Sequence, residues 1–452
     1  MTLARSITGA LAARSRRRRV WDSIAHPRLG YFAPLPPAPT GVATYSAAVL
    51  AGLRRIGFLD RRRVDVAWPI EPKHEGLVPW YQLGIYHVGN NLEFHQDIYR
   101  FACRQPGLVV LHDLALDDFV RGLKVSGDAN GFIAEREAAR LRSRLDGSRL
   151  PVDEPLRDPW CGQVVRSSRG LIVHSDFCRR YLDGIGCRTP VFVVPHPVVE
   201  TEEAMRAAAL RRDELRARID VRDGDVLVVA AGDLNGAKQL EAVLAAVAHL
   251  EASVKVALVG RRIRGVDVER MVDAARLGAR AALLADVSDA DFRGWLFAAD
   301  VVTDLRHPHR GEVSGSLARA MQAGRPTIVS ATGTYLDVPD DLVRRVAAGP
   351  TDPHELAVAI RTLAEDPDQR ARIGAAAADH VRRLRESEAT ARGYEEAIEH
   401  TLALVRDPAR AAAARWAGSL ADVGVDESLL ARGYGLSYAR ALASFAQTSE
   451  NL

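Results

Sequence analysis

The stretch Arg306-His307-Pro308-His309-Arg310-Gly311-Glu312-Val313-Ser314-Gly315-Ser316 follows a short apolar run at residues 301–305 and precedes a run of helix formers that Gly324 ends. The apolar run predicts a buried parallel strand, and the later run predicts a helix. In open α/β sheets, ligands bind where a strand ends and a helix begins. Ser314 or Ser316 can cap this helix, whose free N–H groups and positive end suit a phosphate. An alternative interpretation is a capped helix whose charged loop is only solvated.

The composition is that of a globular protein of two or three domains. The chain has 452 residues, of which 47% are hydrophobic and 26% charged. The 61 basic and 58 acidic residues leave a net charge of +3, which gives no reason to expect a nucleic-acid partner. The four cysteines form no C-x-x-C pair, so we expect reduced thiols in a cytoplasmic protein. The sequence contains no run of 18 apolar residues, so it predicts no transmembrane helix.

Residues 1–20 differ from the rest and are predicted to form a basic N-terminal arm. A weakly apolar segment, residues 3–13, precedes Arg14 and the run Arg16 to Arg19. A secretory signal has the opposite order, with its charges first. The arm is either a disordered basic tail, which we favour, or a short amphipathic segment that contacts anionic membrane lipids at the inner face of the membrane.

Strand-like and helix-like runs alternate from residue 29 to about 385. In the first half, four predicted strands in a row end in polar side chains, including Asn90, His112, His174 and His196. The carboxyl ends of parallel strands lie at one edge of a sheet, so four such ends predict a cleft along that edge. The strands are Leu83–Val88, Leu108–Leu111, Leu171–Val173 and Phe192–Val194.

A charged, alanine-rich segment, Glu200 to Asp223, carries no obvious strand and marks a domain boundary. We therefore expect an N-terminal domain at 21–200, a C-terminal domain at 201–385 and a helical extension at 386–452. In the second domain, Lys238 is predicted to open a helix after a tight loop at 232–236. A lysine in the first helical turn opposes the helix dipole, which a bound anion would offset. A solvated surface lysine is the alternative.

Several common site motifs are absent from the sequence. It contains no P-loop. No G-x-G-x-x-G follows the first strand, which argues against a nicotinamide dehydrogenase. It contains no H-E-x-x-H and no G-x-S-x-G, which argues against a metalloprotease and an α/β-hydrolase.

The motifs that the sequence does contain follow the order of a known family. The chain resembles the family-four retaining glycosyltransferases of the GT-B fold over most of residues 29–385. Each motif is weak alone, but their shared order and spacing make the match specific. They are Pro36 to Tyr45, His87 to Asn91, Leu111 to Asp113, Val173 to Ser175, Val194 to Pro197, Gly232 with Lys238, and Gly311 to Ser316 with Ala320 to Pro326.

The resemblance implies an α/β fold of two Rossmann-like, doubly wound parallel-sheet domains that face each other across a cleft. The second domain would hold a nucleotide-diphosphate sugar as donor substrate, and the first would hold a carbohydrate or lipid-linked acceptor. Lys238 would neutralise the departing diphosphate, Glu312 would bind hydroxyls of the donor, and His112 would lie beside the reacting sugar. The implied donor-binding groups are Gly41, Arg306 and the N–H groups of Ser314, Gly315, Ser316 and Leu317. No metal and no separate cofactor are implied.

Two departures from the family pattern concern the expected donor site. The family has two glutamates eight residues apart, but alignment on Met321 puts Gly311 and Arg319 at those places, with Glu312 one residue later. Asp233 replaces the arginine that usually follows the glycine of the second domain. The pattern resembles a bacterial subgroup with a Gly-Glu-x-Ser-Gly-Ser loop after an Arg-x-Pro triplet. We therefore expect Arg306 to supply the missing positive charge.

These observations predict a retaining, metal-independent glycosyltransferase of the hexosyltransferase type. It would be cytoplasmic or peripheral at the membrane and would act in glycan, glycolipid or polysaccharide synthesis. Two alternatives remain: a nucleotide-sugar-binding protein of the same fold without turnover, and a nucleotide-sugar epimerase.

Overall fold

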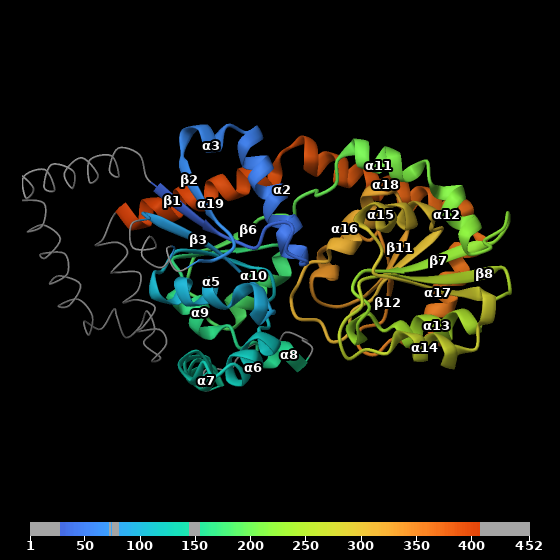
Figure 1. Ribbon diagram of the computed structural model, residues 1–452, viewed down its shortest axis with the longest axis horizontal. Coiled ribbons are helices and arrows are strands. Elements are labelled where there is room, and N and C mark those ends of the chain that lie inside the picture. Colours follow the sequence, from blue (N-terminus) through green and yellow to red (C-terminus); the bar gives the residue numbers. More distant parts are fainter. Residues whose placement is uncertain (1–27, 72–73, 75–80, 144–153, 407–452) are drawn as a thin grey trace, which may run out of the picture.

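The computed structural model describes residues 28–71, 74, 81–143 and 154–406. The predicted basic arm at 1–20 and residues 407–452 of the predicted extension lie outside this part of the chain. The described residues form two lobes, each with a parallel six-stranded sheet between helices (Figure 1). This confirms the predicted fold class of two Rossmann-like α/β domains.

The first sheet has the strand order β2-β1-β3-β4-β5-β6, and its inner strands are apolar because both faces are covered. Its strands are β1 (Arg28–Phe32), β2 (Arg63–Ala67), β3 (Leu83–Val88), β4 (Leu108–Leu111), β5 (Gly170–Val173) and β6 (Val191–Val193). Its helices are α2 (Gly41–Arg55), α3 (Phe58–Arg61), α5 (Leu92–Arg104), α6 (Asp117–Val125), α7 (Ala129–Ser143), α8 (Glu154–Arg157), α9 (Gly162–Ser167) and α10 (Asp176–Gly184).

The second sheet has the order β12-β11-β10-β7-β8-β9. Its strands are β7 (Val226–Ala231), β8 (Val254–Gly260), β9 (Ala281–Ala285), β10 (Val301–Asp304), β11 (Thr327–Ser330) and β12 (Arg344–Val346). Its helices are α11 (Glu202–Ala209), α12 (Arg212–Arg218), α13 (Leu240–Ala248), α14 (Val268–Ala275), α15 (Asp289–Ala298), α16 (Gly315–Gln322), α17 (Pro353–Glu365) and α18 (Pro367–Glu386), with short 3₁₀ turns at Gly236–Lys238, Gly278–Arg280 and Gly333–Asp337.

The last described helix, α19 (Ala389–Arg406), returns from the second lobe and packs on the first (Figure 1). Tyr394 is buried in the core of the first domain, and its hydroxyl lies 2.8 Å from that of Tyr45 on α2. Arg62 forms a bidentate ion pair with Glu399, at 2.7 and 2.8 Å. The helix therefore ties the end of the second domain to the core of the first domain.

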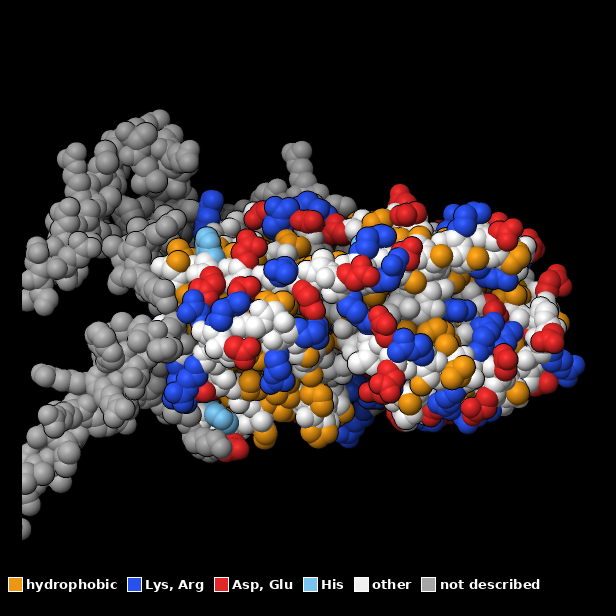
Figure 2. All heavy atoms as spheres, turned by 90° about the horizontal axis from the view of Figure 1, so that it is seen from above, with side chains coloured by type: hydrophobic (Ala, Val, Ile, Leu, Met, Phe, Trp, Pro, Cys, Tyr) orange, Lys and Arg blue, Asp and Glu red, His pale blue; other side chains and the backbone are white. Residues whose placement is uncertain are grey.

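The two lobes also meet directly at the loop that follows β10. The N–H groups of Leu114 and Ala115 in the first domain both donate to the carbonyl of Arg310, at 2.9 Å. The Arg310 guanidinium pairs with Asp117 of α6 at 2.8 Å. On the surface, side chains of both charges are interspersed over both lobes (Figure 2). No helix among the described residues is long and apolar enough to cross a membrane.

Candidate functional site

The candidate site lies where the strand order of the second sheet reverses. From β7 the chain continues to β8 on one side, whereas β10 pairs with β7 on the other side. The loops after β7 and β10 therefore diverge and leave a crevice at the carboxyl edge of the sheet. The His307 N–H donates to the Ala237 carbonyl at 2.9 Å, which joins the two loops. The loop at residues 306–316 and Lys238 thus lie next to each other at the carboxyl edge of the second sheet.

Lys238 does not open a helix, contrary to the sequence prediction. It ends a short 3₁₀ turn, and Gln239, with φ of +51°, separates it from α13, which begins at Leu240. The helix-dipole argument therefore does not apply to it. Its side chain is buried, at 5% exposed, and its ammonium group pairs with the carboxylate of Asp304, which is fully buried at the end of β10. The Tyr335 hydroxyl donates to the same carboxylate at 2.9 Å.

Helix α16 points its first turn toward Lys238. Ser314 is the N-cap, and its Oγ accepts the N–H of Leu317 at 3.3 Å, which leaves the Gly315 and Ser316 N–H groups without an intrahelical partner. A Cβ added to Gly232 would lie 2.6 Å from Ser316 Oγ and 3.1 Å from Lys238 Nζ. The Gly232 backbone, the ammonium group and the helix start therefore converge.

Arg306 and Glu312 form a second ion pair in the same loop. Arg306 Nε lies 3.2 Å from Glu312 Oε1, while Glu312 Oε2 accepts the Arg310 N–H at 2.7 Å and lies 3.7 Å from His309 Nδ1. Burial raises the pKa of Glu312, but the charges of His309 and Arg306 outweigh it and hold this pKa below its usual value. Both carboxylate oxygens have partners within the loop, which fixes the orientation of the Glu312 side chain.

His112 lies in the first domain among other imidazoles. Its Nε2 is 3.1 Å from Nδ1 of His87, and its ring packs on Tyr45 and lies 5.4 Å from the ring of His174. Burial lowers the pKa values of His87 and His112 well below 6.5, and that of His174 to about 3. These rings are therefore neutral at pH 7, so each has one nitrogen that can donate and one that can accept a hydrogen bond.

Gly41 starts α2 at the edge of the first domain. No atom lies within 4 Å of the position that a Cβ would take there, so the surrounding space is open. Thr40 caps the helix by accepting the Val42 N–H at 3.4 Å. The preceding residue, Pro39, accepts a hydrogen bond from Arg261 of the second domain. The start of α2 is thus held facing the second lobe.

Three functional candidates were missed from the sequence: Asp304, Tyr335 and Asp113. Asp113 follows β4, accepts the Asn90 N–H at 2.8 Å, and has a pKa that burial, and next the charge of Glu312, raises to about 7. The available signal was a carboxylate at the end of an apolar strand, as with Asp304, since such a charge needs a partner when buried. Tyr335 gave no such signal.

The residues at the two departures from the family pattern have structural contacts. Arg319 pairs with Glu200 of the interdomain segment at 2.8 Å and lies over the ring of Phe292. Gly311 has φ of +83°, and a Cβ there would lie 2.5 Å from Leu114. Asp233 pairs with Arg261 at 2.8 Å. None of these contacts involves the Lys238 ammonium group.

No group of three or more His, Cys, Asp or Glu side chains within the described ranges has the geometry to hold a metal ion. The sequence contains three Asp-x-Asp triplets, beginning at Asp223, Asp289 and Asp366. In the fold, Asp291 pairs with Arg211 at 2.8 Å, and Asp366 caps α18. Asp225 lies 3.3 Å from Lys255.

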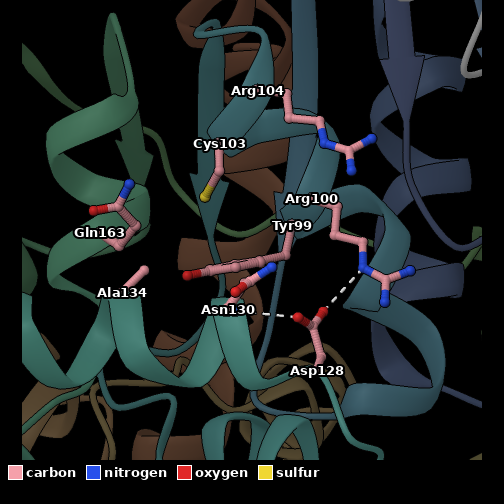
Figure 3. Close-up of a pocket in the computed structure, with 9 residues that line it drawn as sticks. Tyr99, Arg100, Cys103, Arg104, Asp128, Asn130, Ala134 and Gln163 are labelled. Atoms are coloured by element: carbon pink, nitrogen blue, oxygen red, sulfur yellow. Dashed lines mark hydrogen bonds and ion pairs between the residues drawn. The ribbon is translucent and has the colours of Figure 1, made fainter.

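A separate cavity of about 520 Å³ lies in the first domain between α5, α7 and α9 (Figure 3). Its charged groups are paired, with Arg100 3.0 Å from Asp128, and the Tyr99 hydroxyl donates to buried Glu135 at 2.7 Å. None of its lining residues comes from the second domain. They are Tyr99, Arg100, Cys103, Arg104, Asp128, Asn130, Gly131, Ala134 and Gln163.

Part of the sequence and the fold are similar to those of known proteins. Residues 211–380 match the family described as glycosyl transferases group 1. No curated protein matches the chain. The fold is similar to HepE of Anabaena in complex with UDP and glucose, with 16% identity, 83% of this chain and 100% of that chain covered, and a TM-score of 0.56.

Two further solved structures have the same fold. Sucrose-phosphate synthase of Thermosynechococcus elongatus is 17% identical, with 84% of this chain and 99% of that chain covered and a TM-score of 0.57. A glycosyltransferase of Rickettsia africae is 11% identical, with 83% and 98% covered and a TM-score of 0.54. The second domain of this chain therefore has the sequence pattern of the group 1 glycosyltransferases, and the described residues have the two-domain GT-B fold.

Proposed function

We propose that this protein is a retaining glycosyltransferase that moves a hexosyl group from a nucleotide-diphosphate sugar to a carbohydrate or lipid-linked acceptor. The family match over residues 211–380 supports the reaction class, and the binding of UDP by HepE supports a nucleotide-sugar donor. The retention of configuration and the independence from metal follow from the resemblance of the motifs. The protein acts in the cytoplasm or at the inner face of the membrane, in glycan, glycolipid or polysaccharide synthesis.

The observation that carries this proposal is the convergence of Gly232, Lys238 and the start of α16. Loss of the sugar leaves negative charge on the departing diphosphate. A buried ammonium group and the free N–H groups of Gly315 and Ser316 would stabilise that charge with little rearrangement. Such preorganised donors are worth about 3 kcal/mol each in known enzymes. Gly232 lets the diphosphate approach the backbone closely.

His112 and Arg306 complete the proposed assignment. His112 lies at the carboxyl end of β4, on the first domain, where its neutral ring would contact the transferred sugar as a hydrogen-bonding group. Arg306 would supply positive charge where the family usually has an arginine in place of Asp233. Both are partly buried and held by neighbours, Arg306 by Glu312 and His112 by His87. Such fixed groups suit a site that acts by positioning.

One observation favours the alternative of a nucleotide-sugar-binding protein without turnover. Both cations of the site are already paired with carboxylates, Lys238 with Asp304 and Arg306 with Glu312. Turnover separates the two functions. We expect the purified protein to release a nucleoside diphosphate from its donor only when an acceptor extract is present.

A thermal-shift panel of UDP-, GDP- and ADP-sugars should first identify the donor. A ligand at 100 times its Kd stabilises a protein by about 2.7 kcal/mol. Binding without release in any acceptor extract would favour the non-catalytic alternative. Conversion of the donor sugar without an acceptor would favour an epimerase, and the absence of any nucleotide-sugar binding would refute the proposal.

A further inference from the structure

Asp304 has no role among the groups assigned above, although its carboxylate contacts the ammonium group of Lys238. It is fully buried, and its two oxygens contact Lys238 and Tyr335. Burial raises the pKa of Asp304, but the charges of Lys238 and Arg306 outweigh it and hold this pKa below its usual value. Asp304 is therefore a fixed negative charge inside a site proposed to bind an anion.

The charges around the site are balanced before any ligand binds. Lys238 and Arg306 are the cations, and Asp304 and Glu312 are their partners. Burial lowers the pKa of Lys238, and the charge of Asp304 is the largest effect that opposes this. A buried lysine without a partner would tend to lose its proton. Asp304 therefore supplies the negative charge that favours protonated Lys238 when no ligand is bound, and a bound phosphate, itself an anion, would supply that charge in its place.

The same charge must act against a bound diphosphate. A carboxylate in contact with the Lys238 ammonium lies within a few ångströms of any phosphate oxygen on that ammonium. Like charges at such distances repel strongly in a buried site. Resting on the proposed function, we infer that Asp304 is an internal counter-ion of Lys238, which occupies the ion pair in the empty site and weakens the retention of the nucleoside diphosphate product.

The matched control for this role is Asp300, at the opposite end of β10. Its carboxylate also forms ion pairs, which are partly buried, with Arg212 at 2.8 Å and Arg216 at 2.7 Å, and accepts the Leu227 N–H at 2.9 Å. Loss of either charge should lower the stability of the domain, but only Asp304 contacts Lys238. A purely structural role for Asp304 would make the two substitutions alike.

The test is calorimetric titration of UDP, GDP and ADP into the full-length wild type, Asp304→Asn, Asp300→Asn and Tyr335→Phe. Asp304→Asn should bind the nucleoside diphosphate about tenfold more tightly, a change of about 1.4 kcal/mol. Asp300→Asn should bind it like the wild type. Tyr335→Phe should bind it more weakly, because a carboxylate that loses its hydroxyl donor holds Lys238 more strongly.

Equal or weaker binding by Asp304→Asn would overturn the counter-ion role while leaving the proposed function intact. If Asp304→Asn does not fold, Tyr335→Phe decides: weaker binding supports the role, and equal or tighter binding overturns it. A wild type that binds none of the three nucleotides would overturn the proposed function, and this role with it.

Discussion

Two buried lysines of the second domain pair with aspartates at opposite edges of its sheet. Lys238 contacts Asp304 at the carboxyl edge, whereas Lys255 lies 3.3 Å from Asp225 at the amino edge. Both ion pairs need both partners, because removal of one leaves a buried charge that costs about 3–5 kcal/mol. Only the first pair adjoins Gly232 and α16. Substitution of Lys255 should therefore affect stability alone, whereas substitution of Lys238 should affect stability and ligand binding.

We expect Lys238→Met to weaken nucleoside diphosphate binding by about 10- to 100-fold, since hydrogen bonds to charged groups contribute about 1.5–3 kcal/mol. Lys255→Met is the control, which should lose stability in urea without losing affinity. Calorimetric titration and urea unfolding measure the two effects. Equal affinities of Lys238→Met and the wild type would contradict the assignment of Lys238.

At the scale of elements, the carboxyl ends of β3 to β6 place buried imidazoles side by side around Tyr45. Besides the shift of His174, burial lowers the pKa of His196 to about 4. Burial also lowers to about 4 the pKa of His95, which lies on α5 with its Nδ1 2.9 Å from the His87 carbonyl oxygen. An unfolded chain protonates these rings near pH 6.5, whereas the folded protein keeps them neutral. Folding stability contributed by these rings is therefore present above pH 6.5 and is lost as the pH falls toward 4.

Two carboxyls, of the partly buried Asp113 and the buried Glu135, act in the opposite direction. Burial raises the pKa of Asp113 to about 7 and that of Glu135 to about 7, so the folded protein holds their protons between pH 4 and 7. Five shifted imidazoles outnumber them, so we expect net loss of stability from pH 6.5 to 4. His174→Asn, which can keep the hydrogen bond to Val194, should reduce the slope by about 1.4 kcal/mol per pH unit. Urea unfolding at several pH values measures this slope, and an unchanged slope would contradict the interpretation.

The elements differ in how well the sequence predicted them. Inner strands such as Leu83–Val88 are buried on both faces, so their apolar runs are visible in the sequence. The edge strands β2 and β12, Arg63–Ala67 and Arg344–Val346, are partly exposed and carry arginines, so no apolar run marked them. The loop after β10 was predicted as part of the site. The pairing of Lys238 with Asp304 was not, because it joins residues 66 positions apart.

At the scale of the whole molecule, the loop after β10 connects the two domains as well as forming the site. Gly311 lies against Leu114 of the first domain, and Cys178 donates from its thiol to the Gly311 carbonyl at 3.1 Å. Arg180 of the first domain also pairs with Asp337 of the second at 2.7 Å. The packing of the loop after β10 is therefore coupled to the contact between the lobes.

We expect Gly311→Ala to separate the lobes, because its Cβ would lie 2.5 Å from Leu114 and its φ is +83°. Gly127→Ala is the matched control, with φ of +81° and no atom within 4 Å of its Cβ. Both substitutions carry backbone strain, but only the first adds a clash between domains. Small-angle X-ray scattering should show a larger radius of gyration for Gly311→Ala alone. Equal radii would contradict the coupling.

The central claim is that a nucleoside diphosphate binds against Gly232, Lys238 and the start of α16. The most direct measurement is calorimetric titration of UDP, GDP and ADP into the wild type, Gly232→Ala and Gly224→Ala. Gly224 and Gly232 flank the same strand, with φ of +88° and +116°, but a Cβ at Gly224 has no atom within 4 Å. We predict that Gly224→Ala binds the same nucleotide as the wild type and that Gly232→Ala binds it at least about tenfold more weakly, a loss of about 1.4 kcal/mol. Equal affinities of the two variants, or a wild type that binds none of the three nucleotides, would contradict the account.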